Sequence, residues 1–152
     1  MTLDDMLAER AITRTLILIA RAMDDRDWAA LDDLVAPDVT ADLGTGELRG
    51  LVAIVTSIRS FLDDCGPTQH LLGNVLVDVD GDTATSRAYV SDMHIGAGDR
   101  SELTFRTLGD YRDSWVRRGD RWLLARRVKH NRAHIGSFAA LGPGPGGWSP
   151  RG

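Results

Sequence analysis

The second half of the chain has the pattern of two consecutive β-hairpins, and this pattern constrains the fold more than any other feature. Residues 68–79 and 83–95 flank Asp80-Gly81-Asp82, and residues 103–117 and 121–132 flank Arg118-Gly119-Asp120. Short Gly-containing turns between β-rich segments are typical of hairpins. A polar connection over 96–101 joins the two hairpins. The sequence therefore predicts four antiparallel strands in one sheet.

The first half, by contrast, is predicted to be mainly helical. Apolar residues recur every three or four positions from Leu7 to Met23, as one face of a long helix requires, and Asp24 continues this inward stripe. The later elements expected are a short helix over 28–35 capped by Asp27 and ended by Pro37, a strand over 39–43, and a helix over 51–62 that starts at Gly50 and stops before Gly66-Pro67. Helices followed by antiparallel strands predict an α+β fold with a curved sheet around the helices.

Composition narrows the class of protein. A chain of 152 residues, 43% hydrophobic, can form one compact domain without disulfides, and the single Cys65 fits a reducing compartment. The net charge of −4 argues against binding to nucleic acid or an anionic membrane. There is no apolar run of about 18 residues and no basic signal-like N-terminus, so we expect a cytoplasmic protein.

The C-terminal segment differs in composition from the rest. Residues 136–152 are rich in Gly and Pro, which disfavours regular structure, so we expect one domain over 1–135 and a tail after it. A mobile tail is the simpler interpretation. Alternatively, its apolar residues Phe138, Leu141 and Trp148 fold back as a lid or contact a partner.

Histidine titrates near neutral pH, and two of the four histidines lie in the first predicted hairpin. A three-residue loop over 80–82 would pair His70 with Asp92 and place His94 diagonally on the same face, whereas a two-residue loop would separate the histidines. The face selected by the longer loop mixes apolar and polar side chains, as a pocket wall does: His70, Leu72, Asn74, Leu76, Ala88, Val90, Asp92 and His94.

Asp24 and His70 form the candidate acid–base pair. A buried carboxylate that accepts from one imidazole nitrogen fixes the tautomer and leaves the other nitrogen as a base or acid. The simpler alternative is that Asp24 caps a nearby backbone group or pairs with Arg26, while His70 is a satisfied core histidine.

Other catalytic chemistry has weaker support. His130 and His134 are four residues apart, but no third ligand is suitably spaced, so no metal site is predicted. The chain has no nucleophile elbow, P-loop or GxGxxG motif. Tyr111 either points its hydroxyl into a pocket or is an ordinary tyrosine of an amphipathic strand.

Four segments, taken in order, resemble a known family. MDDRDWAALDDLVAPDVTADLG, TQHLLGN, GDTATSRAYVSDMH and GDYRDSWVRRGDRWLLARR resemble the SnoaL-like division of the nuclear-transport-factor-2-like superfamily, over roughly residues 5–132. The resemblance implies a cone, or cystatin-like roll, in which a curved antiparallel sheet and about three helices enclose an apolar pocket. It also implies acid–base chemistry without a cofactor on a small or medium hydrophobic molecule, such as a polyketide, steroid or terpenoid.

Within this family the pattern is most similar to scytalone dehydratase. The resemblance assigns catalytic roles to Asp24, His70 and His94, with His70 removing a proton α to a carbonyl and returning it to the departing hydroxyl. The tyrosines that polarise the carbonyl in that enzyme correspond to Met23 and Leu43, so Tyr111 is a candidate replacement donor. The predicted substrate-binding residues are Met23, Leu43, Asn74, Val90, Asp92 and Tyr111.

A dehydratase is therefore the favoured function. The alternatives are an isomerase or cyclase in the same pocket, or a non-catalytic module for ligand binding or assembly. The fold often pairs through the outer face of its sheet, on which we expect Val75, Val77, Tyr89 and Met93. The predicted partners are a small hydrophobic substrate and a second copy of the chain, as a homodimer or higher homo-oligomer, and neither nucleic acid nor a membrane.

Overall fold

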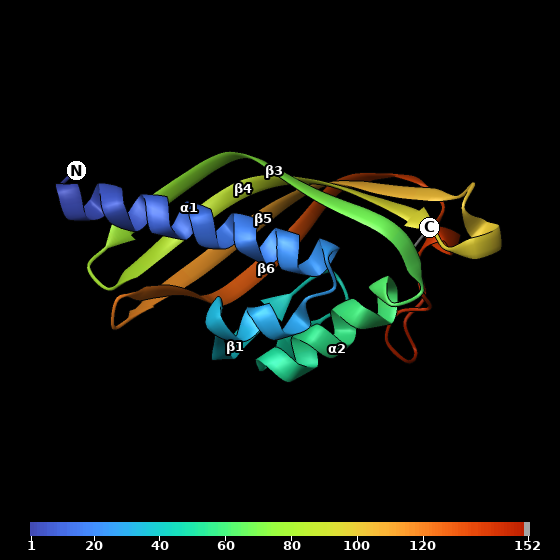
Figure 1. The fold of residues 1–152 in the computed structure, drawn as a ribbon, viewed down its shortest axis with the longest axis horizontal. Coiled ribbons are helices and arrows are strands. Elements are labelled where there is room, and N and C mark those ends of the chain that lie inside the picture. The colour runs from blue at the N-terminus through green and yellow to red at the C-terminus, as the bar shows by residue number, and fades with distance from the viewer. Residues whose placement is uncertain (151–152) are drawn as a thin grey trace.

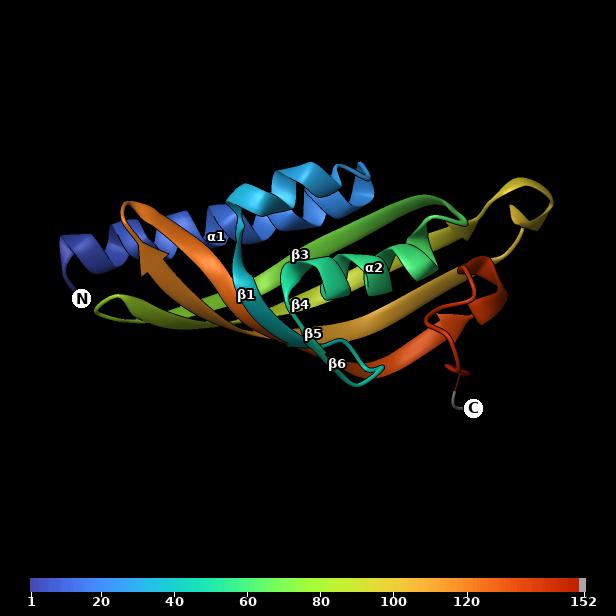
Figure 2. The same ribbon diagram turned by 90° about the horizontal axis from the view of Figure 1, so that it is seen from below.

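The computed structural model describes residues 1–150 and contains one curved sheet of six strands in the order β2-β1-β6-β5-β4-β3. Helices α1, η1 and α2 lie on the same side of this sheet in both views (Figures 1 and 2). The predicted α+β fold class is confirmed. The elements are α1 (Leu3–Asp24), η1 (Trp28–Asp33), β1 (Val35–Asp42), β2 (Glu47–Arg49), α2 (Leu51–Leu62), β3 (Cys65–Asp80), β4 (Thr83–Gly96), η2 (Gly98–Arg100), β5 (Thr104–Arg118), β6 (Arg121–Gly136) and η3 (Phe138–Ala140), where η denotes a 3₁₀ helix.

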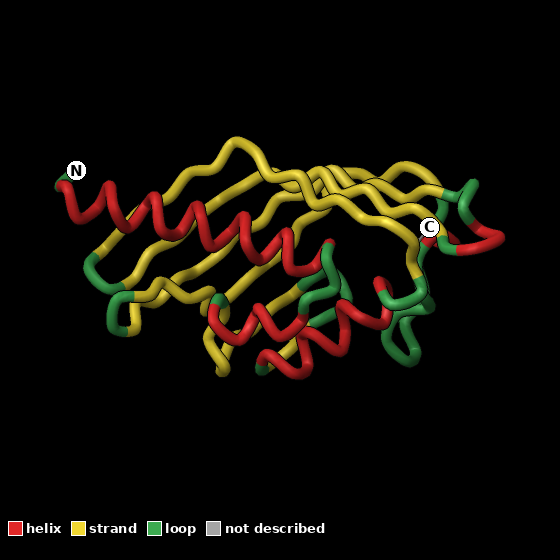
Figure 3. Tube along the Cα trace, in the orientation of Figure 1, coloured by secondary structure: helices red, strands yellow, loops and turns green. Residues whose placement is uncertain are grey.

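The two long hairpins, β3–β4 and β5–β6, form most of the sheet. Their turns lie near the N-terminal end of α1, and the β4–β5 connection and the C-terminal segment lie at the opposite end (Figure 3). No helix among the described residues is both long and apolar enough to cross a membrane.

Local sequence specifies the start and the buried face of α1. The Thr2 hydroxyl accepts from the Asp5 N–H and the Asp5 carboxylate accepts from the Thr2 N–H, so the helix begins with a capping box. Leu7 is exposed rather than buried, whereas the adjacent Ala8 faces the core. The residues that α1 buries are Ala8, Ile12, Leu16, Ile19, Ala20, Ala22 and Met23.

The segment after η1 differs from the sequence prediction. A strand begins at Val35, whereas a helix was predicted over 28–35 and a strand only over 39–43. The register of β1 against β6 shifts within this stretch, so Pro37, which has no N–H to donate, lies in an irregular part of the strand. β1 also runs parallel to β6, and the short strand β2 was not predicted.

The loop of the first hairpin is shorter than predicted. Asp80 pairs with Thr83, so the loop consists of Gly81 and Asp82 and the prediction of a three-residue loop is wrong. Gly81 has a φ of 59°, a left-handed conformation that glycine adopts without strain and that tight hairpin turns need.

A bulge in β3 nevertheless produces the predicted pairing at the histidines. Asn74 and Val75 of β3 lie opposite the single residue Ala88 of β4, and Asn74 adopts a φ of 51°. An extra residue in one strand shifts the pairing by one position. His70 therefore lies opposite Asp92, as the longer loop would have placed it.

The same bulge corrects the prediction for the outer face of the sheet. Val75 and Val77 pack against the core, and Leu76 is exposed, because every side chain between the bulge and the turn changes face. Tyr89 is exposed on the outer face, as expected, and Met93 is partly buried there. The homodimer stays a prediction.

Candidate active site

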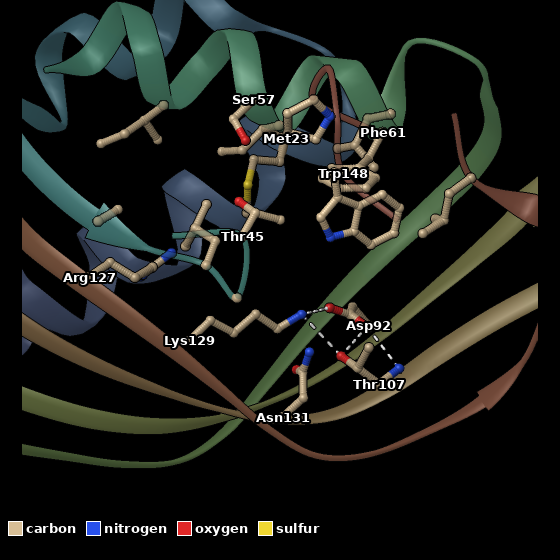
Figure 4. A pocket seen from close by; sticks show the side chains of 18 of the residues that line it. Met23, Thr45, Ser57, Phe61, Asp92, Thr107, Arg127, Lys129, Asn131 and Trp148 are labelled. Atoms are coloured by element: carbon tan, nitrogen blue, oxygen red, sulfur yellow. Dashed lines mark hydrogen bonds and ion pairs between the residues drawn. The ribbon is translucent and has the colours of Figure 1, made fainter. Parts of the chain in front are cut away.

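The helices and the concave face of the sheet enclose a cavity of about 840 Å³, within the usual size of small-molecule sites. Figure 4 shows polar side chains on the sheet side of this cavity and Met23, Phe61 and Trp148 on the side of the helices and the C-terminal segment. Most of the lining is apolar. The polar and titratable side chains of strands β3 to β6 that line the cavity are His70, Asp92, His94, Thr107, Tyr111, Arg127, Lys129, Asn131 and His134.

Asp24 and His70 form the expected hydrogen bond. Asp24 is the last residue of α1, and its Oδ1 lies 2.7 Å from Nδ1 of His70, which is near the start of β3. Its Oδ2 accepts from the His70 backbone N–H at 2.9 Å. Because a carboxylate only accepts, Nδ1 carries the proton in the neutral form of His70, and Nε2 of that form has a free lone pair. The side chains of His70 and Asp24 are only 7% and 18% exposed.

The network around Asp24 keeps its carboxylate ionised. Burial alone would raise the pKa of Asp24, but hydrogen bonds from the side chain and backbone of His70, together with one from Thr68 at 2.9 Å, lower that pKa below its ordinary value. Asp24 is therefore a fixed negative charge that orients His70.

Arg26 supports this arrangement without pairing with the Asp24 carboxylate. Its guanidinium donates to the backbone oxygens of Met23 and Gly66 at 2.9 and 3.1 Å, and to the Thr68 hydroxyl at 2.8 Å. Arg26 thus binds carbonyls left free at the end of α1 and fixes that end to β3. Of the simpler alternatives, the ion pair between Asp24 and Arg26 is not formed.

His94 lies next to His70 on the same face. The two ring centroids are 5.7 Å apart and the rings are nearly perpendicular. Nδ1 of His94 lies 3.1 Å from the Phe105 carbonyl oxygen, so Nδ1 donates and Nε2 is an acceptor. Burial of the ring lowers the pKa of His94 below the ordinary value for histidine, which favours the neutral form at neutral pH.

A second charged group adjoins the histidines, and of its two members sequence reasoning had predicted Asp92 but not Lys129. Both oxygens of Asp92 are bonded: Oδ1 accepts from the backbone N–H and hydroxyl of Thr107 at 2.9 and 2.5 Å, and Oδ2 accepts from Nζ of Lys129 at 2.5 Å. Burial would raise the pKa of Asp92, but the Lys129 ammonium and these hydrogen bonds lower it. Asp92 and Lys129 are therefore a buried ion pair.

A third charged group lies further along the sheet. Arg127 donates two hydrogen bonds to Asp113, at 2.9 and 2.8 Å, and its guanidinium carbon lies 3.7 Å from the centroid of the Tyr111 ring. Burial strongly raises the pKa of Tyr111, so its phenol stays protonated at neutral pH. Both Arg127 and Tyr111 line the cavity.

The structure separates the predicted substrate-binding residues into two groups. Met23, Leu43, Asp92 and Tyr111 line the cavity, but Asn74 and Val90 do not. Asn74 forms the exposed bulge of β3. Val90 points inward but is covered, since a Cβ placed on Gly109 would lie 2.9 Å from its side chain.

The presence of Lys129 and Arg127 in the site could have been inferred from the sequence. They are two residues apart in a predicted strand and therefore share one face, and Lys129 is the single lysine of the chain. Their acidic partners could not be inferred, because Asp92 lies 37 residues and Asp113 lies 14 residues away in the sequence.

His70, Asp92 and His94 each place one potential metal-ligand atom within 4.8 Å of the others. Asp92 already accepts from Lys129 and Thr107, and His70 is held by Asp24. A cation here would have to displace the Lys129 ammonium, so the three residues fit acid–base chemistry better than metal binding.

The C-terminal segment closes one end of the cavity. The ring of Trp148 lies 4.9 Å from that of Phe61 in α2, and both line the cavity. The backbone N–H of Gly142 donates to the Phe61 carbonyl at 2.8 Å. Residues 141–150 contain neither helix nor strand, yet they fold back onto the domain.

Comparisons with known proteins agree with this architecture. The SnoaL-like domain model matches residues 4–128. The uncharacterized protein Rv2910c of Mycobacterium tuberculosis is 34% identical over 122 residues, which cover 78% of this chain and 81% of that protein.

Three solved structures have a similar fold. From Novosphingobium aromaticivorans, a "putative aromatic ring hydroxylase" has a TM-score of 0.78 at 26% identity, covering 87% of this chain and 94% of that one. A "putative scytalone dehydratase" from the same organism has a TM-score of 0.79 at 21% identity and covers 99% and 100%. The hexachlorocyclohexane dehydrochlorinase LinA-type3 from Novosphingobium barchaimii has a TM-score of 0.78 at 15% identity and covers 94% and 98%.

Proposed function

This chain belongs to the SnoaL-like family of the nuclear-transport-factor-2-like superfamily, and on that premise we propose that it is a cofactor-independent lyase that uses Asp24 and His70 for acid–base catalysis. The favoured reaction is the dehydration of a hydrophobic β-hydroxy carbonyl compound. The observation that carries the proposal is the 2.7 Å contact between Asp24 and His70 at the edge of an apolar cavity. Solved structures with this fold include proteins named as a dehydratase and a dehydrochlorinase, and both names describe eliminations.

In the proposed reaction, Nε2 of His70 takes a proton from the carbon α to the carbonyl group. The electron pair of the broken C–H bond forms an enolate, which expels the hydroxyl group from the β carbon as a C=C bond forms. The His70 imidazolium gives its proton to the departing hydroxyl, so water leaves and His70 is neutral again. Asp24 stabilises the imidazolium and holds its tautomer, as carboxylates do in other histidine-dependent sites.

His94 has a different role in this proposal. Its Nδ1 donates to the Phe105 carbonyl, so its Nε2 is a hydrogen-bond acceptor. Because burial lowers the pKa of His94, this ring stays neutral while His70 takes the proton from the substrate. An acceptor at this position binds the hydroxyl group of the substrate and holds it near the proton carried by His70.

The proposal is tested with β-hydroxypropiophenone in deuterated buffer. NMR measures exchange of the α protons and formation of the unsaturated ketone. We expect exchange and elimination in the native protein, and a loss of about 10²- to 10⁴-fold in His70→Ala, because a positioned general base contributes about that much. Asp24→Asn should lose a similar factor, since an amide can donate to Nδ1 and leave Nε2 protonated.

His130→Ala is the matched control, because His130 lies on the same sheet but is exposed and does not line the cavity. Circular dichroism verifies that all variants are folded. Full turnover in folded His70→Ala would contradict the proposal. Binding of the ketone without exchange or elimination in the native protein would favour a ligand-binding module.

A further inference from the structure

Lys129 holds a reachable positive charge inside the cavity. Both members of the ion pair line the cavity, and the side chain of Lys129 is 14% exposed whereas that of Asp92 is 1% exposed, so Lys129 is the more accessible of the two. Figure 4 shows Lys129 extending from β6 across the sheet to Asp92 and Thr107. Two of its N–H bonds are used by these partners, Asp92 at 2.5 Å and Thr107 at 3.0 Å. An ammonium has three N–H bonds, so one remains for a ligand.

The surrounding residues fix this ammonium in place. Thr107 bonds both Asp92 and Lys129, and Asp92 is covered by the sheet. The Lys129 side chain passes over Gly109, where a Cβ would lie 3.1 Å from its Cε. The Lys129 ammonium is therefore held by hydrogen bonds to the Asp92 carboxylate and the Thr107 hydroxyl, and Gly109 leaves room for its aliphatic chain.

The position of Lys129 relative to His70 suggests its chemical role. A carboxylate oxygen of Asp92 lies within 4.8 Å of a ring nitrogen of both His70 and His94, and the Lys129 ammonium is one hydrogen bond further along. Removal of an α proton by His70 places negative charge on the carbonyl oxygen, a few ångströms from the carbon that loses the proton. Met23 and Leu43, which also line the cavity, have no hydrogen-bond donor in their side chains.

Resting on the proposed function, we propose that Lys129 binds the carbonyl oxygen of the substrate and stabilises the negative charge that forms on it when His70 acts. A fixed cation in a largely apolar cavity stabilises developing charge more than water does, because it needs no reorganisation during the reaction. Lys129 is thus a catalytic residue of the lyase, and the substrate is a ketone or similar carbonyl compound rather than a hydrocarbon with only a hydroxyl group.

The aromatic side chains of the cavity narrow the substrate class further. Phe61, Phe105, Phe138 and Trp148 line the cavity, and the rings of Phe105 and Phe138 are 4.5 Å apart. Aromatic walls favour a flat ring by stacking and edge-to-face contacts. The substrate class that fits both the cation and the aromatic wall is an aryl or fused-ring ketone, with its oxygen at Lys129 and its ring against these side chains.

The test uses para-nitrophenol as a probe of the oxygen site, because its phenolate absorbs visible light and mimics an enolate. Native protein should favour the bound phenolate and lower the apparent pKa of the probe. A cation at this distance shifts the pKa of a neighbouring acid by about one to three units. Lys129→Met should abolish that shift and reduce α-proton exchange of β-hydroxypropiophenone by about 10²- to 10³-fold, whereas Lys129→Arg should keep part of both.

Lys129→Met leaves Asp92 buried without its partner, so the double variant Asp92→Asn, Lys129→Met is tested beside it to remove both charges. Arg132→Met is the matched control, since Arg132 is another β6 cation paired with a carboxylate, Asp110, but on the exposed face. This control should leave both the probe shift and the exchange unchanged.

The two proposals fail in different ways. If His70→Ala keeps the phenolate shift and loses exchange, while Lys129→Met loses both, both proposals are supported. If native protein does not favour the phenolate, or Lys129→Met and the double variant keep the shift, the role of Lys129 is wrong, whatever His70 does. Borohydride trapping of a ketone adduct on Lys129 would also overturn it, because it would show a covalent Schiff base instead of a charge contact.

Discussion

At the scale of single residues, the site depends on which group holds which proton. Asp24 and Asp92 are both kept ionised by donors that outweigh the effect of burial, and His94 is kept neutral by burial. In the proposed mechanism, the cavity combines a base, an acceptor and a cation on one face of the sheet. The ionised states of Asp24 and Asp92 follow from fixed donors, whereas the neutral state of His94 follows from burial, and the Phe105 carbonyl decides which of its nitrogens carries the proton.

The state of His94 predicts how stability depends on pH. Its folded-state pKa lies below the ordinary value of about 6.5. The unfolded chain consequently binds more protons than the folded chain between these two values. The free energy of unfolding should therefore fall as pH is lowered through about 6.5, by at most about 1.4 kcal/mol per pH unit. Asp24 and Asp92 have lowered pKa values, so their contributions are present above about pH 4 and are lost only below it.

Urea denaturation of the native protein and of His94→Gln between about pH 7.5 and 5 measures this effect. The variant should show a flatter dependence, and the exposed control His130→Gln should behave like the native protein. An equal slope in His94→Gln would mean that another group causes the loss of stability.

At the scale of elements, the β3 bulge decides which residues face the cavity. The hairpin loop sets the register of β3 against β4, and the bulge at Asn74 shifts that register by one residue. Even-numbered residues such as His70 therefore face inward before the bulge, and odd-numbered residues such as Val77 face inward after it. The site needs this irregularity, because a regular β3 paired from the same loop would turn His70 away from Asp24.

Substitutions at Asn74 should separate backbone strain from side-chain effects. Asn74→Val should lower the free energy of unfolding by about 1–2 kcal/mol, since a β-branched residue is strained at a φ of 51°. Asn74→Gly should change it by less than about 0.5 kcal/mol and keep activity, because glycine adopts this conformation freely. Thermal unfolding and the exchange assay measure both. Equal stabilities of the two variants would show that the left-handed conformation at this position is not important.

At the scale of the whole molecule, the C-terminal segment forms part of the wall of the cavity, together with the helices and the sheet. Arg100 of η2 donates to the backbone oxygens of Ala139 and Leu141, and the Phe61 carbonyl accepts from Gly142, so the segment is fixed at several points. Phe138 and Trp148 then form a wall beside α2.

Removal of an aromatic side chain from that wall should raise KM more than it lowers kcat. In Trp148→Ala we expect KM for β-hydroxypropiophenone to rise about 5- to 10-fold with kcat nearly unchanged, since an aromatic contact contributes about 0.5–1.5 kcal/mol. The control is Trp28→Ala, because Trp28 is a half-buried tryptophan that does not line the cavity. Steady-state kinetics of both variants distinguish the two positions. A similar rise in KM in Trp28→Ala would indicate a general loss of stability.

Much of the secondary structure of this protein could be predicted from its sequence. The periodicity of α1, the two hairpins and the polar face of β3 and β4 are local patterns, because side chains that share a helix stripe or a strand face are close in the sequence. The same patterns place Asp24 at the end of α1 and His70 near the start of β3, and so make them candidates for pairing, but they do not bring together two residues 46 positions apart.

The tertiary structure decided the rest. The two-residue loop and the compensating bulge depend on packing along the whole of β3, which no short segment records. Asp92 and Lys129 are 37 residues apart in the sequence, and their ion pair forms only when β4, β5 and β6 lie side by side. The C-terminal segment has no periodic pattern, and it is ordered by hydrogen bonds to α2 and η2. Long-range contacts therefore formed the ion pair, the aromatic wall and the contact of Asp24 with His70, whereas local patterns had specified the helices and strands that carry these residues.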